Sequence, residues 1–160
     1  MAAEIIRLSE TDFSIAGRLV KIDACEAHRL LENSWNILNS GYIARCYWAD
    51  GKVKNELLHR SIVGAPTGVI VDHIDGDKLN NRLSNLRICT HSENMRNRKT
   101  ASSNVSGLKG VEITKSGTFR ATIRANKVIY RLGTFATAEE AHAAYCEASA
   151  ELHGEFSRTA

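Results

Sequence analysis

The chain has 160 residues, of which 43% are hydrophobic and 24% charged, and its formal net charge at pH 7 is +3. This composition predicts a globular protein with one compact domain or two small ones, and without a run of about 18 apolar residues we expect no membrane-spanning helix. The four cysteines form no C-x-x-C pair, and the first residues lack the basic and apolar parts of a secretion signal. We therefore expect neither a disulfide framework nor a zinc ribbon, and a cytoplasmic location.

Positive charge is concentrated in the middle of the sequence. Residues 82–131 hold eleven Lys and Arg against two acidic residues, whereas the remainder holds ten against sixteen. A basic centre between acidic flanks is typical of proteins that bind nucleic acid through its phosphates. A charged segment is usually only a solvated surface, but this one begins inside a motif with catalytic residue types, which favours a function.

Residues 1–66 predict a mixed, β-rich region that supports the rest of the chain. We expect strands over 4–8, 35–38, 42–48 and 53–58, a helix over 23–32 and a short helix over 59–63. The aromatic residues of this region are expected in the core or on sheet faces rather than as base-stacking platforms: Trp35, Tyr42, Tyr47 and Trp48. His59-Arg60 precedes the next hairpin directly and could reach a phosphate.

Residues 67–99 predict a compact ββα unit. Val69-Ile70-Val71 is typical of a strand, and residues 86–89 can form the strand that returns beside it. Thr90 and Glu93 form a capping box, which predicts a helix from residue 91 to about residue 98. A unit of this size is too small to hold a core alone, so it depends on the rest of the chain or on a metal ion.

Carboxylate, imidazole and carboxamide groups recur along this unit. Asp72 directly precedes His73, and Asn85 and Asn94 follow in the next two segments. Oxygen ligands and a histidine are what hydrolysis of a phosphodiester with one hard metal ion requires. Two alternatives are a solvated loop without function and a calcium-binding turn in the acidic loop. The calcium turn lacks the downstream Glu that an EF-hand needs.

This motif resembles the HNH nucleases, in particular the phage and intron-encoded branch whose last motif residue is Asn. The three motif positions correspond to His73, Asn85 and Asn94, with no gap over about thirty residues. The resemblance implies that Asp72 and Asn94 bind a divalent metal and that His73 is the general base. It also implies that Asn85 orients the His73 ring through a hydrogen bond. Because Asn offers only oxygen as a ligand, Mg²⁺ (or Mn²⁺) is expected rather than Zn²⁺.

Residues 100–106 predict a polar linker, and residues 107–160 predict a separate domain. We expect strands over 110–114, 118–124 and 128–133, followed by a helix from 138 to about 153 that begins with a Thr137–Glu140 capping box. The helix residues expected to face the sheet are Ala141, Tyr145, Ala148 and Leu152. The histidines expected on helix surfaces are His28, His142 and His153.

The last segment resembles the AP2 DNA-binding domain. The matching residues are Gly107-Leu108-Lys109-Gly110-Val111, Phe119-Arg120-Ala121-Thr122-Ile123-Arg124, Leu132-Gly133-Thr134-Phe135, Thr137-Ala138-Glu139-Glu140-Ala141 and Ala144-Tyr145. The resemblance implies a three-stranded antiparallel sheet that lies in the major groove of DNA. The residues expected to contact DNA, including those of the ββα unit, are Arg87, Arg96, Arg98, Lys109, Lys115, Arg120, Arg124 and Arg131. Glu112 departs from this basic surface, and Arg87 and Arg96 have a surface salt bridge as their rival role.

These observations predict an α+β protein with a ββα-metal (His-Me finger) core, a β-rich N-terminal support and a C-terminal AP2-like sheet and helix. The predicted function is metal-dependent hydrolysis of double-stranded DNA by a phage-type, homing-type HNH endonuclease. One site should cut one strand, so we expect a nicking monomer, with a dimer as the alternative, and no small-molecule cofactor. The competing functions are a noncatalytic DNA-binding regulator and, less favoured, an RNA-binding module without the stacking platforms that single strands need.

Overall fold

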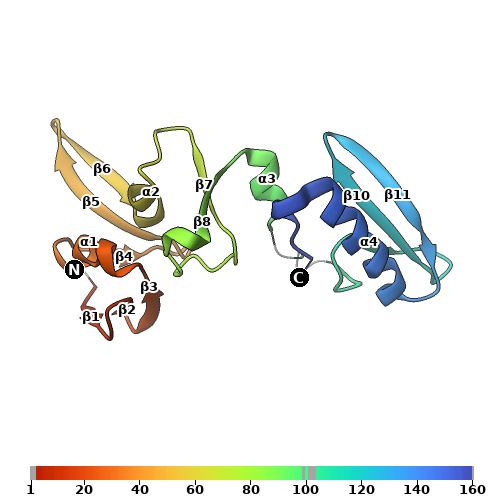
Figure 1. Cartoon of the computed structure of the whole chain (residues 1–160), viewed down its shortest axis with the longest axis horizontal. Coiled ribbons are helices and arrows are strands. Elements are labelled where there is room, and N and C mark those ends of the chain that lie inside the picture. The colour runs from red at the N-terminus through yellow and green to blue at the C-terminus, as the bar shows by residue number, and fades with distance from the viewer. Residues whose placement is uncertain (1–2, 99, 101–103, 160) are drawn as a thin grey trace. The chain divides into compact units, whose positions relative to one another are not determined.

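The computed structural model describes residues 3–98, 100 and 104–159. The chain divides into two compact units, Met1–Thr90 and His91–Ala160, shown in Figure 1. The boundary between the two units therefore lies before the expected linker at residues 100–106. Residues 101–103 of that linker lie outside the described residues. Asn104 already belongs to the second unit, because its Nδ2 donates a hydrogen bond to Leu108 O at 2.9 Å. Within the described ranges, no helix is long and apolar enough to cross a membrane.

The first unit is built from short antiparallel sheets and small helices. Its sheets have the orders β1-β2-β3, β4-β5-β6 and β7-β8. Its elements are β1 (Ile5–Arg7), β2 (Asp12–Ile15), β3 (Arg18–Lys21), η1 (Ala24–Glu26), α1 (Ala27–Leu31), β4 (Asn36–Ile37), β5 (Ile43–Ala49), β6 (Lys52–Leu57), α2 (Leu58–Val63), β7 (Ile70–His73), η2 (Leu83–Asn85) and β8 (Leu86–Cys89).

The β2–β3 hairpin is absent from the sequence-based prediction. Each of its strands has only four residues, too few for alternation to be a clear signal. Its turn has positive φ angles at Ala16 (51°) and Gly17 (74°), the combination of a tight hairpin turn that alanine rarely adopts. A search for Asn-Gly or Asp-Gly turn signals therefore passes over this hairpin.

One hydrophobic core holds the first unit together, and the β2–β3 hairpin supplies much of it. Phe13 and Ile15 of β2 and Val20 of β3 are fully buried. Trp35 is 1% exposed, and its Nε1 donates a hydrogen bond to Arg29 O at 2.7 Å. The same core includes Val71, Leu79 and Leu86 from the ββα segment. The first two strands of that segment are therefore supported by apolar packing from the N-terminal region.

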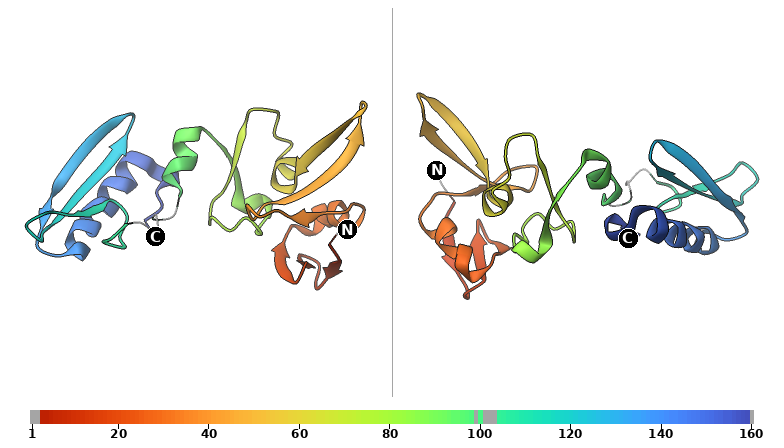
Figure 2. Two further views of the ribbon diagram at one scale, coloured as in Figure 1. Left: turned by 180° about the vertical axis from the view of Figure 1, so that it is seen from behind. Right: turned by 45° about the horizontal axis from the view of Figure 1, so that its top comes forward.

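The second unit is a three-stranded antiparallel sheet covered by a long helix. The sheet has the order β11-β10-β9, and both views of Figure 2 show α4 running along one of its faces. Thr137 Oγ1 accepts from Glu140 N and Glu140 Oε2 accepts from Thr137 N, both at 3.2 Å, which confirms the predicted capping box. The elements are α3 (His91–Arg96), β9 (Val111–Ile113), β10 (Phe119–Ala125), β11 (Val128–Phe135), α4 (Ala138–His153) and η3 (Gly154–Phe156).

The buried face of α4 differs from the predicted one after its second turn. Ala141 and Tyr145 are buried as expected, but the following buried residues are Ser149 and His153, while Leu152 is 37% exposed. The expectations for Leu152 and His153 are therefore wrong. His153 lies 3.3 Å through Nδ1 from Ser149 Oγ and 3.2 Å through Nε2 from the carbonyl oxygen of Arg124 in β10. With both ring nitrogens hydrogen-bonded, its burial costs little.

The other two helix histidines differ from each other. His28 is exposed, as predicted. His142 is half-buried instead, with Nδ1 3.0 Å from Lys109 O and its ring stacked on Tyr145. The polar ring of His142 thus joins the start of β9 to α4, a contact between distant segments that helical spacing does not reveal.

Candidate functional site

Strand β7 positions the two residues at the centre of the candidate site. Asp72 is 8% exposed and His73 is 3% exposed, and they pair across the ribbon with Arg87 and Leu86 of β8. Both side chains are buried although they point to opposite faces of the strand, because both faces are covered. A buried carboxylate and a buried imidazole need polar partners, and the neighbouring loop supplies several.

The loop over residues 74–81 is held by its own acidic side chains. Asp75 accepts hydrogen bonds from Asp77 N at 2.8 Å and from Asn80 Nδ2 at 2.7 Å. Burial alone would raise the pKa of the Asp75 carboxyl, but hydrogen bonds from Asn80, Asp77 and Asn85 outweigh burial and lower it. Backbone hydrogen bonds of Leu79 and Asn81 to Lys21 join the loop to the end of β3. The loop is therefore a fixed part of the first unit.

Asn85 stabilises this loop. Its Oδ1 accepts from Asp75 N at 3.0 Å, and its Nδ2 donates to Asp75 Oδ1 at 2.9 Å and to Asn80 O at 2.8 Å. These three hydrogen bonds occupy the carboxamide. The structure therefore shows Asn85 hydrogen-bonded to the loop, and the expected hydrogen bond from Asn85 to the His73 ring stays a prediction.

The residue that orients His73 is Asn81, which the sequence did not single out. His73 Nε2 lies 3.3 Å from Asn81 Oδ1, and Asn81 Nδ2 donates to Lys78 O at 3.2 Å. The second contact fixes which end of the carboxamide faces the ring. Because Oδ1 can only accept, the tautomer of His73 that satisfies this contact is the one protonated on Nε2. The only signal in the sequence was the Asn-rich stretch at residues 80–81.

His73 is held in its neutral form by its surroundings. Burial lowers the pKa of its imidazole, and the hydrogen bond with Asn81 and the charges of Asp75, Asp72 and Asp77 only partly oppose this shift. A neutral imidazole with a lone pair on Nδ1 can accept a proton at pH 7. The nearby carboxylates favour the positive charge that the ring would then gain.

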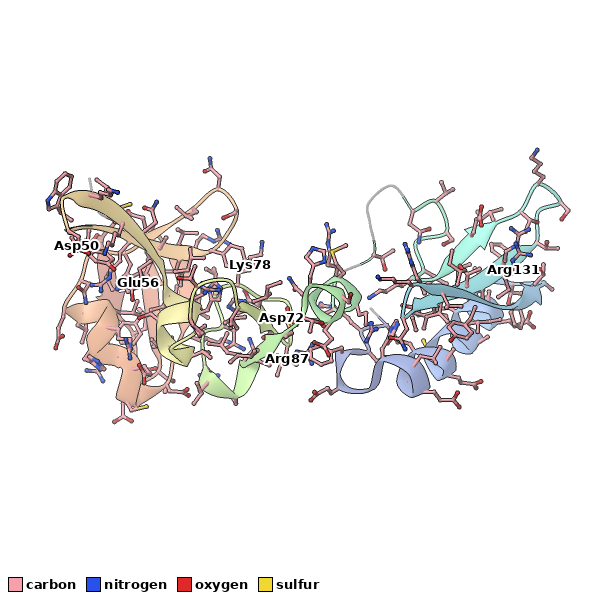
Figure 3. All side chains as sticks on the ribbon, turned by 90° about the horizontal axis from the view of Figure 1, so that it is seen from above. Asp50, Glu56, Asp72, Lys78, Arg87 and Arg131 are labelled. Atoms are coloured by element: carbon pink, nitrogen blue, oxygen red, sulfur yellow. The ribbon has the colours of Figure 1, made fainter. Side chains whose placement is uncertain are left out.

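Asp72 is paired with Arg87 across the two strands. Arg87 Nη2 and Nε lie 3.0 Å and 3.2 Å from Asp72 Oδ2, and Figure 3 labels both side chains. The Arg87 side chain is only 12% exposed. Of the two expected roles of Arg87, the structure shows a salt bridge, although a buried one, and the DNA phosphate clamp stays a prediction.

Three further polar residues surround His73. The rings of Tyr42 and His59 are stacked with centroids 5.0 Å apart, and each also faces His73, at 6.1 Å and 5.0 Å. Lys78 Nζ lies 4.3 Å from the centroid of the Tyr42 ring. Arg60, by contrast, donates to Val69 O and to Pro66 O, so it closes the loop before β7 rather than reaching for a phosphate. Tyr42 was expected only as a packing residue.

Asn94 lies on α3, in the second unit, so its pairing with Asp72 at a metal ion stays a prediction. Among the residues that the structure describes, no three His, Cys, Asp or Glu side chains gather as at a closed metal centre. The donor set still fits one kind of ion, because Mg²⁺ typically takes one or two carboxylates and completes its shell with water and substrate phosphates. Asp72 and a carboxamide oxygen are of that hard-oxygen type.

The outer face of the second unit's sheet carries the expected arginines. Arg120, Arg124 and Arg131 are all exposed, and Arg131 pairs with Thr122 in the cross-strand register. Glu112 lies beside them, with Oε2 3.8 Å from Arg120 Nη1. The face is therefore basic with one partly neutralised position.

The remaining predicted DNA-binding residues fall into two groups. Arg98 and Lys115 are exposed, and Arg96 is half-buried with Nη2 3.5 Å from Asn126 Oδ1. Lys109 is different, because its ammonium donates to three backbone carbonyl oxygens at 2.6–2.8 Å, those of Arg96, Arg98 and Arg158. Burial, and after it the charge of Arg158, lowers the pKa of Lys109 to about 8. Lys109 thus joins three backbone segments of its own unit, and its expected phosphate contact stays a prediction.

Comparison with known proteins places the site in a family. The family model described as HNH endonuclease matches residues 58–96. An uncharacterised HNH endonuclease of Acanthamoeba polyphaga mimivirus is 36% identical over 91 residues, which span 57% of this chain and 46% of that protein. Protein 3.8 of Escherichia phage T7 is 39% identical over 94 residues, 58% of this chain and 77% of that protein.

A solved structure of the HNH homing endonuclease I-HmuI, from work on its DNA binding and cleavage, is 21% identical with a TM-score of 0.38. That alignment covers 88% of this chain and 74% of the other, and it is too weak to support a structural argument. The sequence matches suffice, because the phage relative is covered over most of its length and the family match contains Asp72, His73, Asn81 and Asn85. The chain belongs to the HNH endonuclease family.

Proposed function

We propose that the protein is a DNA endonuclease that uses one divalent metal ion and His73 as general base to cut one strand of a duplex. The observation that carries this proposal is the buried His73, whose proton is fixed on Nε2 by Asn81 at 3.3 Å. In that tautomer Nδ1 is the nitrogen that would accept a proton from a water molecule. His73 also follows Asp72 directly, within the segment that the HNH endonuclease family model matches.

The proton transfer follows from the surroundings of His73. The neutral ring takes a proton from water at Nδ1 as the water oxygen bonds to phosphorus. The ester bond from phosphorus to the 3′ oxygen breaks, and that oxygen leaves and takes up a proton from solvent. The imidazolium that results donates from Nε2 to Asn81 Oδ1 and is favoured by the carboxylates of Asp72 and Asp75. The fixed loop keeps this geometry, because Asn81 is 1% exposed and its backbone is hydrogen-bonded to Lys21.

Asp72 and Asn94 would hold the metal, and Mg²⁺ or Mn²⁺ suits their oxygen atoms. Bound there, the ion would supply positive charge for the phosphate oxygens in the transition state. Arg87 fixes the direction of the Asp72 carboxylate through Oδ2. A single site of this kind acts on one strand, so we expect a monomer to nick DNA.

We further propose that the second unit binds double-stranded DNA through its sheet, as an AP2-like domain would. The exposed Arg120, Arg124 and Arg131 offer guanidinium groups for guanine edges and phosphates, and Lys115 lies at the turn before β10. Arg96 and Arg98 belong to the same unit and could add phosphate contacts. Binding of this kind should weaken steeply as salt is raised.

A supercoiled-plasmid assay tests the nuclease proposal. Wild type and His73→Ala are compared with Mg²⁺, with Mn²⁺ and with EDTA. We expect open-circular DNA only from wild type with metal, because removal of the base should lower the rate by about 10²–10⁴-fold. Equal cleavage by His73→Ala would show that His73 is not the general base.

A noncatalytic DNA-binding regulator is the second candidate, and one observation favours it. Arg87 already neutralises Asp72 at 3.0 Å, so this carboxylate is stable in the fold without a metal ion. In that case wild type would bind DNA in a salt-sensitive way and would leave the plasmid intact with either metal. Nicking by wild type would exclude this alternative.

A further inference from the structure

Two side chains from separate segments face the His73 ring, and a lysine from a third segment lies over one of them. Tyr42 comes from the segment before β5, His59 from α2, and Lys78 from the loop after β7. The rings of Tyr42, His59 and His73 form a triangle with centroid distances of 5.0, 5.0 and 6.1 Å. Lys78 Nζ lies over the Tyr42 ring at 4.3 Å and donates to Ser40 O at 2.7 Å. The cluster lies against the proposed general base.

The polar ends of this cluster are not used by the fold. Within the described part of the chain, no hydrogen bond is made by the ring nitrogens of His59 or by the Tyr42 hydroxyl. His59 is 4% exposed, but its ring nitrogens keep some contact with solvent, because Asn80 Oδ1 is the one fully buried polar side-chain atom without a partner in the described part of the chain. Lys78 uses one of its three N–H groups on Ser40 O. Phenylalanine would fill the positions of Tyr42 and His59 equally well if packing were their only role.

These groups are hydrogen-bond donors at neutral pH. Burial, and then the charge of Asp72, raises the pKa of Tyr42, so its hydroxyl keeps its proton. Burial, followed by the charges of His73 and Arg60, lowers the pKa of His59 to about 4, so its ring is neutral with one N–H. A phenol, an imidazole N–H and an ammonium together suit an anion with several oxygen atoms.

The acidic residues nearby do not cancel this preference. Asp72 is paired with Arg87, and Asp75 accepts from Asp77 N, Asn80 Nδ2 and Asn85 Nδ2. The carboxylates are therefore engaged with partners of the first unit. The Lys78 ammonium over the Tyr42 ring is not part of these pairs, because its hydrogen bond is to a backbone carbonyl oxygen.

We propose that Tyr42, His59 and Lys78 bind the non-bridging oxygens of the DNA phosphodiester that His73 acts upon. This inference rests on the proposed nuclease function and names the part of the site that holds the substrate. Donors that are already in position when charge develops on those oxygens lower the barrier without reorganisation. Lys78 is held in place by Ser40 and Tyr42, so little side-chain freedom is lost when it binds a phosphate.

Three conservative variants test the inference: Tyr42→Phe, His59→Phe and Lys78→Gln. Each retains most of the side-chain volume and removes only the polar group. Under single turnover with supercoiled plasmid and Mg²⁺, we expect each variant to nick at least tenfold more slowly than wild type. Urea unfolding followed by tryptophan fluorescence should give a midpoint no lower than that of wild type for Tyr42→Phe and His59→Phe, because neither polar group makes an internal hydrogen bond in the described chain. A purely structural role would lower the midpoint instead. Lys78→Gln loses the hydrogen bond to Ser40 O, so it is judged by the salt dependence of binding.

Matched controls come from residues of the same types outside the cluster. Tyr47→Phe and Lys54→Gln alter a tyrosine of β5 and a lysine of β6 that are both exposed, and they should nick within twofold of wild type. Nicking by the three cluster variants at the rate of these controls would overturn the inference while leaving the nuclease proposal intact.

A binding measurement separates the inference from the nuclease proposal. Fluorescence anisotropy of a labelled 30-base-pair duplex in EDTA measures DNA binding without cleavage. We expect each cluster variant to bind severalfold more weakly than the two control variants. For Lys78→Gln, the slope of log affinity against log salt should become shallower by about 0.9, the value for one phosphate contact. Weaker binding by the variants supports the phosphate contact even if wild type does not nick. Affinities and slopes equal to those of the controls overturn it.

Discussion

Replacing Asn85 with alanine should destabilise the first unit by about 3 kcal/mol. The structure gives the Asn85 carboxamide three hydrogen bonds, one to the amide of Asp75, one to its carboxylate and one to Asn80 O. A typical intramolecular hydrogen bond contributes about 1 kcal/mol, and groups left without a partner add to the loss. The same substitution would have little effect on stability if Asn85 only oriented the His73 ring, so the experiment decides between the two roles.

Tryptophan fluorescence is the natural assay, because it reports on the first unit alone. The sequence has two tryptophans, and both lie in that unit: Trp35 is 1% exposed and Trp48 is 71% exposed. With a urea dependence of about 1.5 kcal/mol per molar, a loss of about 3 kcal/mol lowers the unfolding midpoint by about 2 M. Asn39→Ala, at an exposed position, is the matched control and should leave the midpoint unchanged. An unaltered midpoint for Asn85→Ala, together with lost nicking, would refute the assignment of Asn85 to the loop.

Three other predictions concern burial. Because burial lowers the pKa of His59 to about 4, the unfolded chain, with an imidazole pKa near 6.5, binds the proton first. The unfolding free energy of the first unit should thus fall by about 3 kcal/mol from pH 6.5 to pH 4; a midpoint of Trp35 fluorescence that is independent of pH would contradict this. Gly110→Ala should unfold the second unit, seen as loss of its dispersed amide signals by NMR, because a Cβ would lie 2.0 Å from Tyr145 Cδ2 at a φ of +78°. Lys109→Met should cost the same unit about 2–3 kcal/mol in amide exchange, since three carbonyls lose their donor, and unchanged exchange would show these hydrogen bonds to be unimportant.

The elements that the sequence predicts well are those whose signals are local. The β10 alternation of Phe119, Ala121 and Ile123 against Arg120 and Arg124 is reproduced in the burial pattern, and β8 begins and ends at the expected residues. Strand alternation and the capping box at the start of α4 depend on neighbours within about eight residues, which the sequence displays directly. The β2–β3 hairpin has no such local signal, and its importance follows only from its packing in the core.

The buried face of α4 shows why burial is harder to predict than helix formation. Hydrophobic spacing selects Leu152, yet the structure buries His153 and Ser149 and exposes Leu152. His153 is buried because a carbonyl oxygen of β10 lies 3.2 Å from its Nε2. The position of that oxygen depends on the register of the sheet. A hydrogen bond from a distant strand thus outweighs the difference in hydrophobicity between neighbouring helix positions.

The candidate site was predictable in its residue types and not in its partners. Asp72 and His73 could be found from their adjacency and the motif around them. The motif spacing cannot show that Asn81 reaches the His73 ring, because Asn81 and Asn85 are asparagines in the same polar stretch. Tyr42 and His59 lie 31 and 14 residues before His73 in the sequence, and they come together where α2 packs against β5 and β7.

Hydrogen-bond partners distinguish the polar residues that stabilise this fold from those that can bind a ligand. Asn85, Arg60 and Lys109 have their donors taken by backbone or carboxylate oxygens of their own unit, so their loss should first appear as lost stability. Tyr42 and His59 carry the same kinds of polar atoms with no such bonds in the described chain, so these atoms remain open to a ligand. The sequence predicts that Lys109 contacts a ligand and that Tyr42 only packs. The hydrogen-bond partners indicate the opposite role for each residue. The nicking rate and the urea midpoint, measured together, test these roles.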